Sequence, residues 1–593
     1  MLYTDIITQL QNDIQSILKN VYNYNVPAQN IIIQKTKKEF SGDFSINVFP
    51  FVKQIKLNPQ DIAETIVNEL KKINSNISDS EIIKGFINLK IADKYWLELL
   101  EFINKNGTNN TLPKTDISKK IMIEFSAPNT NKPMHLGHIR NNLLGDSVSR
   151  ILQAFGHEII RVNLINDRGI HICKSMLAWM KFGNNKTPES EGIKGDKFVG
   201  DFYVRFDQEN KKQAAELNIE NEQTDTPLIK EARELLQKWE NNDPQTRKIW
   251  KMMNEWVLEG FDITYKRLGI NFDKIYFESD TYSRGKEIVL NALKNNIVYQ
   301  KDDSSIWIDL SDSNIEEKLL LRSDGTSVYI TQDLGTAEIR FNEYNPDLHI
   351  YVVGNEQIHH FKVLQATIKK LGYDWYDKIL HYSYGMVELP KGMGKMKSRE
   401  GTVVDADDLL DEIVLKTKQI TDASGKLNDF SKQEKEKTYN ILALGALKYY
   451  ILKVDPKKNM IFNPDDSIDI QGNTGPFIQY AYTRINSMLK KSSTNNNILH
   501  DNLQINEYER ELIKNLYSYK DIFAEAAENY SPALIANYAF ELAKSFNQYY
   551  HEINILKESD EKLRAYRLLL SKQIAETLKH ALSLLGIEMP ERM

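Results

Sequence analysis

The chain has 593 residues and a formal net charge of −6 at pH 7, and 41% of its residues are hydrophobic and 27% charged. This length exceeds what a single hydrophobic core supports, so about three or four domains are expected. The negative charge excludes a protein that coats nucleic acid indiscriminately, because such binding depends on neutralising phosphates.

No apolar run is long enough to span a bilayer, and the first residues lack the basic and apolar segments of a secretion signal, so a cytoplasmic protein without membrane contact is expected. The single cysteine, Cys173, excludes an intramolecular disulfide and argues against a thiolate zinc site. No other set of metal ligands is visible. The sequence therefore predicts no zinc and no dedicated metal site.

Residues 1–115 have the pattern of a small α+β unit. Apolar residues recur at helical spacing from Ile6 to Leu18, a strand is predicted at 44–49, and a second helix at 62–70. The polar stretch 104–113 contains Gly107 and Pro113 and reads as a linker.

Residues 116–435 read as an α/β domain. A buried strand at 120–125, a helix from 136 that stops at Gly156, and a strand at 157–162 make one βαβ unit. A second strand, helix and strand are expected at 349–354, through 371, and at about 379–389. Residues from about 181 to 300 are rich in charged residues with helical periodicity, and an insertion into the α/β domain is expected there. From 436 to 593 the pattern is helical throughout, which predicts a helix bundle.

The first chemical motif is His135, Gly137 and His138 at the predicted start of a helix. Two histidines at positions i and i+3 lie on the same side of the first turn, beside free backbone N–H groups and the positive end of the helix dipole. Gly137 lets a flat ring such as adenine approach the backbone. The arrangement suits an anion, but taken alone it is a weak signal, because histidines at helix starts also serve as caps or packing groups.

The second motif is the glycine-rich stretch 392–401, which follows a predicted strand. It places Lys395, Lys397 and Arg399 where a transferring phosphoryl group develops charge. A solvated basic hairpin is the alternative interpretation. A second cationic loop at the other half of the same sheet favours phosphate chemistry.

These two motifs resemble the HIGH and KMSKS motifs of class I aminoacyl-tRNA synthetases, and the surrounding residues are most similar to the arginyl-tRNA synthetase family. The similarity extends to RSDGT at 322–326, YVVGNEQ at 351–357 and the C-terminal LGIEMPERM. The first motif region that resembles the family comprises Pro128, Asn129, Thr130, Asn131, Lys132, Pro133, Met134, His135, Leu136, Gly137 and His138.

The resemblance implies a class I Rossmann-type catalytic domain at 116–435 that takes ATP as substrate with Mg²⁺. The carboxylate of arginine would attack the α-phosphorus, giving arginyl-adenylate and pyrophosphate. His135 and His138 would hold the phosphates and Gly137 would lie under the adenine. ATP contacts are also implied for Lys395, Met396 and Ser398.

The second lysine of KMSKS is missing, because Ser398 stands in its place. The resemblance offers two replacements, Lys132 just before the first motif and Lys397 within the second. We take Lys132 as the working hypothesis.

The resemblance also implies the arginine pocket. A guanidinium is planar and permanently charged, so carboxylates are its natural acceptors. Glu124 and Asp333 match the family's acidic residues, Asn129 and Gln357 would take the main-chain groups of arginine, and Tyr329 would line the pocket.

The partner implied by the resemblance is tRNA(Arg), which would receive arginine on its 3'-terminal adenosine. The helical domain would bind the anticodon through Tyr480, Tyr482 and Arg484, because aromatic and arginine side chains stack on unpaired bases. For any single tyrosine, core packing is the competing interpretation. The N-terminal unit resembles an additional tRNA-binding domain, and a monomer is the family expectation.

Three alternatives compete with this interpretation. A small-molecule nucleotidyltransferase would leave the helical domain unexplained. A non-catalytic paralogue could have lost the histidines or Lys395, but all are present. Synthetases for other amino acids fit less well, because the zinc ligands expected of a synthetase for cysteine are missing and an acidic pocket does not suit aliphatic substrates.

Overall fold

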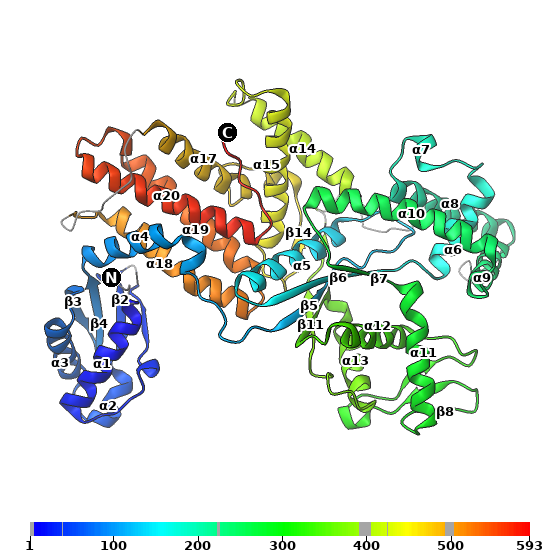
Figure 1. The fold of residues 1–593 in the computed structure, drawn as a ribbon, viewed down its shortest axis with the longest axis horizontal. Coiled ribbons are helices and arrows are strands. Elements are labelled where there is room, and N and C mark those ends of the chain that lie inside the picture. Colours follow the sequence, from blue (N-terminus) through cyan, green and yellow to red (C-terminus); the bar gives the residue numbers. More distant parts are fainter. Residues whose placement is uncertain are drawn as a thin grey trace.

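The structure is a computed structural model that describes residues 5–37, 39–221, 226–388, 390, 405–423, 425–492 and 503–593. A parallel sheet lies near the centre of an elongated molecule (Figure 1). The N-terminal unit and the C-terminal helices lie on one side of this sheet, and the insertion helices lie on the other side. The predicted α/β fold with an N-terminal α+β unit and a C-terminal helix bundle is confirmed.

The N-terminal unit is an antiparallel sheet covered by helices, with strand order β1–β2–β4–β3. The apolar side chains predicted from the helical period, Ile6, Leu10, Ile14 and Leu18, form the buried face of α1. Asp5 caps this helix by accepting hydrogen bonds from two backbone N–H groups of the first turn. The elements are α1 (Ile6–Tyr22), β1 (Ile33–Lys35), β2 (Phe44–Asn47), α2 (Phe49–Ile55), α3 (Pro59–Ile73), β3 (Ile77–Ile83), β4 (Phe86–Ile91) and α4 (Asp93–Asn106).

The N-terminal unit is fastened to helix α18 (Glu507–Glu528) by buried charges. Asp43 is 2% exposed, and one of its carboxylate oxygens lies 3.2 Å from the guanidinium of Arg510. Lys514 lies 3.4 Å from the other oxygen, and Arg510 also pairs with Asp93. The unit and the helix therefore share one desolvated ion cluster.

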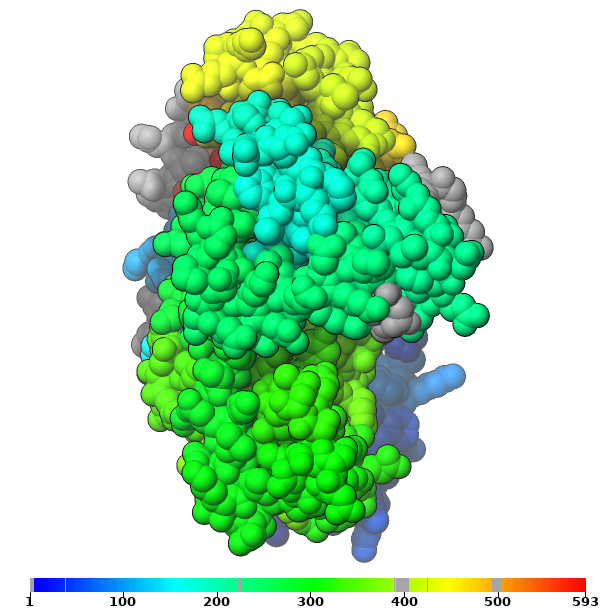
Figure 2. Space-filling view, turned by 90° about the vertical axis from the view of Figure 1, so that its right-hand side faces the viewer, coloured from blue at the N-terminus to red at the C-terminus, as the bar shows by residue number. Residues whose placement is uncertain are grey.

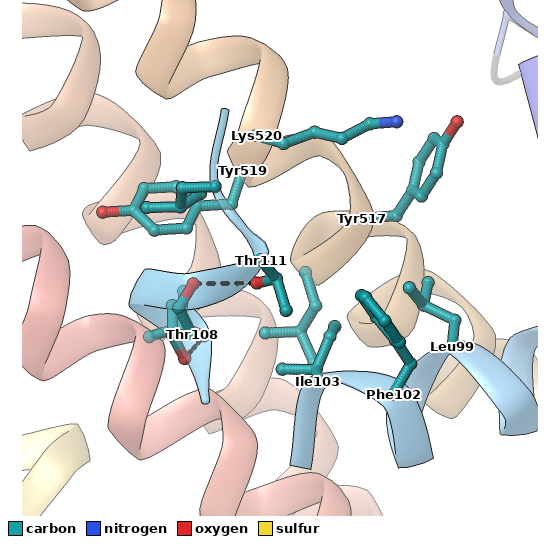
Figure 3. A pocket seen from close by; sticks show the side chains of 11 residues that line it. Leu99, Phe102, Ile103, Thr108, Thr111, Tyr517, Tyr519 and Lys520 are labelled. Carbon is teal, nitrogen blue, oxygen red and sulfur yellow. Dashed lines mark hydrogen bonds between the residues drawn. The ribbon is translucent and has the colours of Figure 1, made fainter. Parts of the chain in front are cut away.

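A small cavity lies beside this contact, between α4, the following 3₁₀ turn (Thr108–Thr111) and α18 (Figure 3). Its volume is about 40 Å³, which is room for one or two water molecules. The Thr111 hydroxyl donates to the Thr108 carbonyl 2.8 Å away at its edge. The cavity is lined largely by apolar and aromatic side chains, among them Leu99, Phe102, Ile103 and Tyr517.

The central sheet has five parallel strands in the order β12–β11–β5–β6–β7. The strand order reverses between β5 and β11. At such a point the loops after the two strands open to opposite faces, and α/β folds bind ligands at the carboxyl ends of these strands. The elements are β5 (Lys120–Glu124), α5 (Leu136–Ala154), β6 (Glu158–Ile165), α6 (Ile170–Phe182), β7 (Lys274–Phe277), α11 (Glu278–Lys294), α12 (Tyr329–Tyr344), β11 (Leu348–Gly354), α13 (Ile358–Lys370) and β12 (Ile379–Tyr384).

Helices fill the chain between β6 and β7, within the range expected to be an insertion. Figure 2 looks onto this end of the molecule, with the insertion helices above the part that contains α11. The range expected as an insertion also contains β7 and α11, which belong to the parallel sheet and its cover. The insertion helices are α7 (Pro188–Glu191), α8 (Gly195–Glu216), α9 (Pro227–Glu240) and α10 (Pro244–Leu268), and a small antiparallel sheet follows with β8 (Tyr299–Gln300), β9 (Ile306–Ile308) and β10 (Lys318–Leu321).

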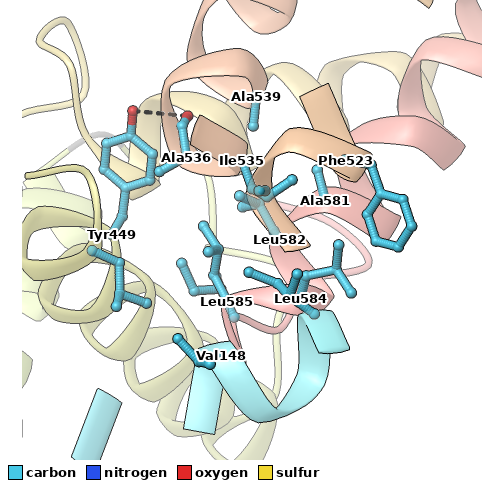
Figure 4. Packing of buried hydrophobic residues seen from close by; sticks show 14 of the residues in the cluster. Val148, Tyr449, Phe523, Ile535, Ala536, Ala539, Ala581, Leu582, Leu584 and Leu585 are labelled. Carbon is cyan, nitrogen blue, oxygen red and sulfur yellow. Dashed lines mark hydrogen bonds between the residues drawn. The ribbon is translucent and has the colours of Figure 1, made fainter. Parts of the chain in front are cut away.

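The C-terminal helices pack directly on α5 (Figure 4). Val148 of α5 lies against Leu582, Leu584 and Leu585, and the Tyr449 hydroxyl donates to the Ala536 carbonyl 3.2 Å away. The Ser147 hydroxyl also donates to the Leu584 carbonyl at 3.0 Å. The helices are α14 (Ala406–Ala423), α15 (Lys432–Leu452), α16 (Pro464–Ser467), α17 (Gly475–Lys491), α18, α19 (Pro532–Glu552) and α20 (Glu561–Leu584).

The strand predicted at about 379–389 is interrupted in the structure. Strand β12 ends at Tyr384, and β13 (Val387–Glu388) pairs in parallel with β14 (Met460–Ile461) outside the central sheet. Gly385 lies between them, where a Cβ atom would come within 2.5 Å of the Lys458 backbone. The chain turns here because glycine permits this approach.

Candidate active site

The loop that leaves β5 is held in a strained conformation. Ser126 and Ala127 have φ angles of 84° and 45°, which non-glycine residues seldom adopt. The Ser126 N–H donates to the Asn141 side chain at 2.5 Å, and the Ala127 N–H donates to the Asn163 side chain at 3.0 Å. These amide side chains fix the path of the chain into residues 135–138, which read HLGH and are called the HLGH turn below. Strain of this kind is concentrated at functional sites.

The two histidines of the HLGH turn form a reciprocal capping box at the start of helix α5. His135 is the N-cap, and its Nδ1 accepts from the Gly137 N–H at 3.1 Å. The Nδ1 of His138 accepts from the His135 N–H at 3.1 Å. In the neutral rings the proton is therefore on Nε2, so each histidine keeps one N–H donor for a ligand. The capping role and the phosphate role are compatible, because they use opposite ring nitrogens.

Both rings are neutral at physiological pH. Burial, reinforced by the positive charge of Lys132, lowers the pKa of His135 to about 4. Burial also lowers the pKa of His138 well below its ordinary value, and His135 and Lys132 add to the effect. The ring centroids are 4.0 Å apart. The site thus offers two neutral N–H donors and one ammonium group close to them.

The second motif lies outside the described residues, including Lys395, Met396 and Ser398, predicted to bind ATP, and Lys397, predicted to be catalytic. The described chain resumes beside the HLGH turn. Asp405 forms a β-bridge with His135, and the Ala406 N–H donates to the Met134 carbonyl at 2.9 Å. Asn129, also predicted as a site residue, forms a bridge with Asn166 after β6.

Several of the residues predicted to bind arginine lie near the starts of α12 and α13. Tyr329 and Asp333 stand one turn apart at the start of α12, and Tyr329 is 77% exposed. His360 of α13 lies 2.5 Å from the Asp333 carboxylate, which raises the pKa of His360. Gln357 is exposed just before α13. The structure therefore brings Asp333 and Tyr329 onto one helical turn.

Glu124 lies deeper than the other predicted pocket residues. Its carboxylate is 6% exposed and forms an ion pair with the fully buried guanidinium of Arg340. The Nε and one terminal nitrogen of Arg340 are buried without a hydrogen-bond partner. Glu124 thus already has an arginine partner from its own chain, under the floor of the pocket.

Glu278 was missed by the sequence reasoning. It is the first residue of α11, directly after β7. Burial raises the pKa of its carboxyl group to about 7; Arg168 opposes this shift, and Asp167 and Asp333 add to it. A carboxylate directly after a strand of the central sheet is a signal that could have identified it, but the sequence analysis does not predict β7 as a strand.

Two glycines bring Glu278 and Asp333 close together. A Cβ atom on Gly285 of α11 would lie 1.8 Å from the Thr331 carbonyl oxygen, and one on Gly335 of α12 would lie 2.4 Å from the Gly285 nitrogen. The backbones of the two helices are therefore in contact near their N-terminal halves, which carry the two carboxylates.

The residues predicted to bind tRNA lie on α17 and are partly exposed. The Arg484 guanidinium lies 4.7 Å from the centre of the Tyr480 ring and 5.1 Å from that of Tyr550. Lys426 lies 3.9 Å from the Tyr480 ring. Tyr480 and Arg484 share a face of the helix, whereas Tyr482 lies on a different side because it is two positions away.

Within the described ranges, no group of three His, Cys, Asp or Glu side chains is arranged to hold a metal ion. No described helix is both long and apolar enough to cross a membrane.

Family models of three domains match this chain. The model described as tRNA synthetases class I (R), catalytic domain, matches residues 102–464. The DALR anticodon binding domain matches 478–593, and the arginyl tRNA synthetase N terminal domain matches 8–91. Together these models extend over most of the chain.

Curated relatives and solved structures agree with the family models. The arginine–tRNA ligase of Parabacteroides distasonis is 49% identical over 99% of both chains, and that of Bacteroides thetaiotaomicron is 48% identical over 97% of this chain and 98% of its own. The fold resembles Thermus thermophilus arginyl-tRNA synthetase, with a TM-score of 0.78, 24% identity and coverage of 99% of this chain and 100% of that chain. The Plasmodium falciparum enzyme gives a TM-score of 0.74 at 22% identity and covers 100% of both chains. The chain therefore belongs to the arginyl-tRNA synthetases, class I aminoacyl-tRNA synthetases that activate L-arginine with ATP, release pyrophosphate and transfer the arginine to tRNA(Arg).

Proposed function

We propose that both steps of this reaction take place at the carboxyl edge of the central sheet, with ATP at the HLGH turn and arginine at the acidic pocket. One observation carries this proposal. The turn presents two neutral Nε2–H donors, while Glu278, directly after β7, and Asp333, near the start of α12, present carboxylates. An anionic and a cationic substrate are thus assigned to adjacent parts of one crevice.

In the first step, His135 and His138 donate to phosphate oxygens of ATP and stabilise the charge that develops in the transition state. Gly137 lies under the adenine. The carboxylate of arginine is ionised at neutral pH, so no general base is needed. Lys395 would neutralise the departing pyrophosphate, with contacts from Met396 and Ser398. ATP enters with Mg²⁺, which the phosphates largely hold.

In the arginine pocket, Asp333 and Glu278 accept hydrogen bonds from the guanidinium. Asn129 and Gln357 contact the main-chain groups, and Tyr329 lines the entrance. A role for Glu124 in binding arginine remains a prediction, and its pairing with Arg340 means that it would act from below the pocket. Lysine is rejected because a point charge leaves part of the acceptor set unpaired.

In the second step, a hydroxyl of the 3'-terminal adenosine of tRNA attacks the adenylate. Tyr480 and Arg484 form a partly exposed aromatic and cationic surface suited to unpaired bases, and Tyr482 is included as a predicted contact. The N-terminal unit provides a further tRNA surface. We also propose that the enzyme is a cytoplasmic monomer.

The test is arginine-dependent exchange of pyrophosphate into ATP by the purified protein, with and without tRNA(Arg), and with lysine as control. Exchange with arginine but not lysine is expected. Exchange with lysine at a comparable rate would contradict the pocket, and no exchange from folded protein under any condition would contradict the catalytic proposal.

Glu278 gives a pH prediction. The pKa of its carboxyl group is raised to about 7, so the group loses its charge as the pH falls through 7. His360 also becomes protonated as the pH falls, and its positive charge then binds the Asp333 carboxylate more strongly. The kcat/KM for arginine, which reports the free enzyme, should therefore fall by up to about tenfold per pH unit below this pKa.

The control for this pH prediction is Glu278→Gln, which removes one of the two titrating groups. The variant should have a lower kcat/KM at pH 8 and a shallower decline between pH 8 and 6. An unchanged profile would show that Glu278 does not meet the guanidinium.

Lys132 gives a second prediction. Its ammonium group is close enough to lower the pKa of both histidines, so it also adds positive charge where the phosphates of ATP would lie. Lys132→Ala should slow pyrophosphate exchange by about tenfold to a hundredfold, the value of one charge-assisted hydrogen bond. Lys132→Arg is the matched control that retains the charge. If Lys132→Ala leaves the rate of pyrophosphate exchange unchanged, Lys132 does not replace the missing second lysine of the motif, and Lys397 becomes the candidate.

A further inference from the structure

Arg140 lies on α5, two residues after His138, and is fully buried. Its guanidinium donates to three backbone carbonyls: Met386 at 2.9 Å, Pro456 at 3.2 Å and Lys458 at 2.7 Å. Among the residues that the structure describes, it forms no ion pair. A buried charge without a carboxylate is costly. If the side chain only had to fill space, a leucine would do so without the free-energy cost of burying a charge.

The three acceptors belong to two chain segments that are far apart in sequence. Met386 precedes β13, and Pro456 and Lys458 lie between α15 and β14. These segments are themselves in contact, because the Gly385 N–H donates to the Pro456 carbonyl at 2.9 Å. Arg140 thus bonds the HLGH helix to both of them at once.

A second contact fixes the same place from the solvent side. The Met386 N–H donates to the Asn459 side chain at 2.8 Å, and Asn459 is exposed. The backbone of Met386 is therefore held on both sides, its carbonyl by Arg140 and its N–H by Asn459. The parallel pairing of Val387 with Met460 continues from this point.

We propose that Arg140 is a positioning residue for adenylate formation, whose guanidinium fixes β13 against the helix that presents His135 and His138. A buried guanidinium suits this task, because its fixed fork bonds several carbonyls and leaves little freedom to slide. The second motif, 392–401, follows β13 in the chain, so a small displacement of β13 relative to the HLGH turn would change the spacing of the two motifs proposed to bind ATP. An error of about 1 Å in a reacting geometry costs about a hundredfold in rate. The inference depends on the proposed role of the two histidines in ATP binding.

The experiment measures pyrophosphate exchange with tRNA(Arg) present for Arg140→Gln, Arg140→Lys and Asn459→Ala. We expect Arg140→Gln to raise the KM for ATP or lower kcat by about tenfold to a hundredfold, with the KM for arginine changed less than about twofold. Arg140→Lys, with three N–H donors, should recover part of the loss. Asn459→Ala should show the same selectivity for ATP with a smaller effect.

The matched control is Ser147→Ala on the same helix. This change removes the bond to the Leu584 carbonyl and leaves β13 untouched, so it should lower Tm without changing the KM for ATP. If Arg140→Gln does not fold, the ATP parameters of Arg140→Lys and Asn459→Ala test the proposal in its place.

The inference is overturned if these variants leave the ATP parameters unchanged, if the KM values for ATP and arginine rise together, or if Ser147→Ala reproduces their effect at an equal loss of Tm. A wild-type protein without exchange, or a His138 variant with full exchange, would instead contradict the proposed function itself. The two failures are therefore distinguishable.

Discussion

Alanine in place of His138 should slow adenylate formation by about a hundredfold to a thousandfold, as expected when one donor to a developing negative charge is removed. Only the Nε2–H of the neutral ring is free to make this contact, because Nδ1 accepts the His135 N–H at 3.1 Å. The measurement is the rate of pyrophosphate exchange at saturating ATP and arginine. The loss should appear mainly in kcat.

The same substitution removes a cap, so stability has to be separated from catalysis. Loss of the bond to the His135 N–H should cost about 0.5–2 kcal/mol of unfolding free energy. His138→Asn can restore a side-chain acceptor at this position and should recover stability without recovering the rate. An exchange rate for His138→Ala within about threefold of the wild type would exclude His138 from the phosphate site.

Methionine in place of Arg510 should destabilise the protein by up to about 3–5 kcal/mol, because it removes one of the two cations that pair with the buried carboxylate of Asp43 and leaves Lys514. Asp43 is 2% exposed and Arg510 is 6% exposed, and Arg510 also donates to the Ile91 carbonyl at 3.0 Å. The measurement is the free energy of unfolding in urea, together with protease sensitivity of the N-terminal unit. Undocking of this unit should make its cleavage faster.

Two controls test this interpretation. Asp43→Asn combined with Arg510→Met removes both charges and should recover part of the lost stability. Lys72→Ala removes a surface pair with Glu69 whose side chains are 66% and 36% exposed, and it should cost less than about 1 kcal/mol. Equal losses for Arg510→Met and Lys72→Ala would show that the buried cluster does not hold the two parts together.

Much of the fold could be predicted because local signals agreed. The apolar spacing from Leu136 to Leu152 defined the catalytic helix, and the polar HLGH start located its N-terminus. The first strand of the central sheet was likewise expected at 120–125 and found at Lys120–Glu124. These features depend on residues that are neighbours in the chain.

Other features depend on contacts between distant residues and gave no local signal. Glu124 and Arg340 are 216 positions apart, so their pairing could not be anticipated from spacing. Strand β7 has four residues in a charged region, and missing it also hid Glu278. The break after Tyr384 follows from the approach of Lys458 to Gly385, which belongs to another segment. Tertiary packing decided each of these cases.

The packing of α5 against α15, α19 and α20 limits how this protein can be divided or recombined. Ser147 of α5 bonds to the Leu584 carbonyl, and the apolar cluster that contains Val148 and Leu152 continues into the C-terminal helices without interruption. A catalytic fragment ending before α15 would expose this apolar face to water and would tend to aggregate. A chimera of two relatives would need the outer surface of α5 and the inner surface of α20 from the same parent. In recombination between relatives, and in engineered chimeras, α5 and α20 should therefore be exchanged together.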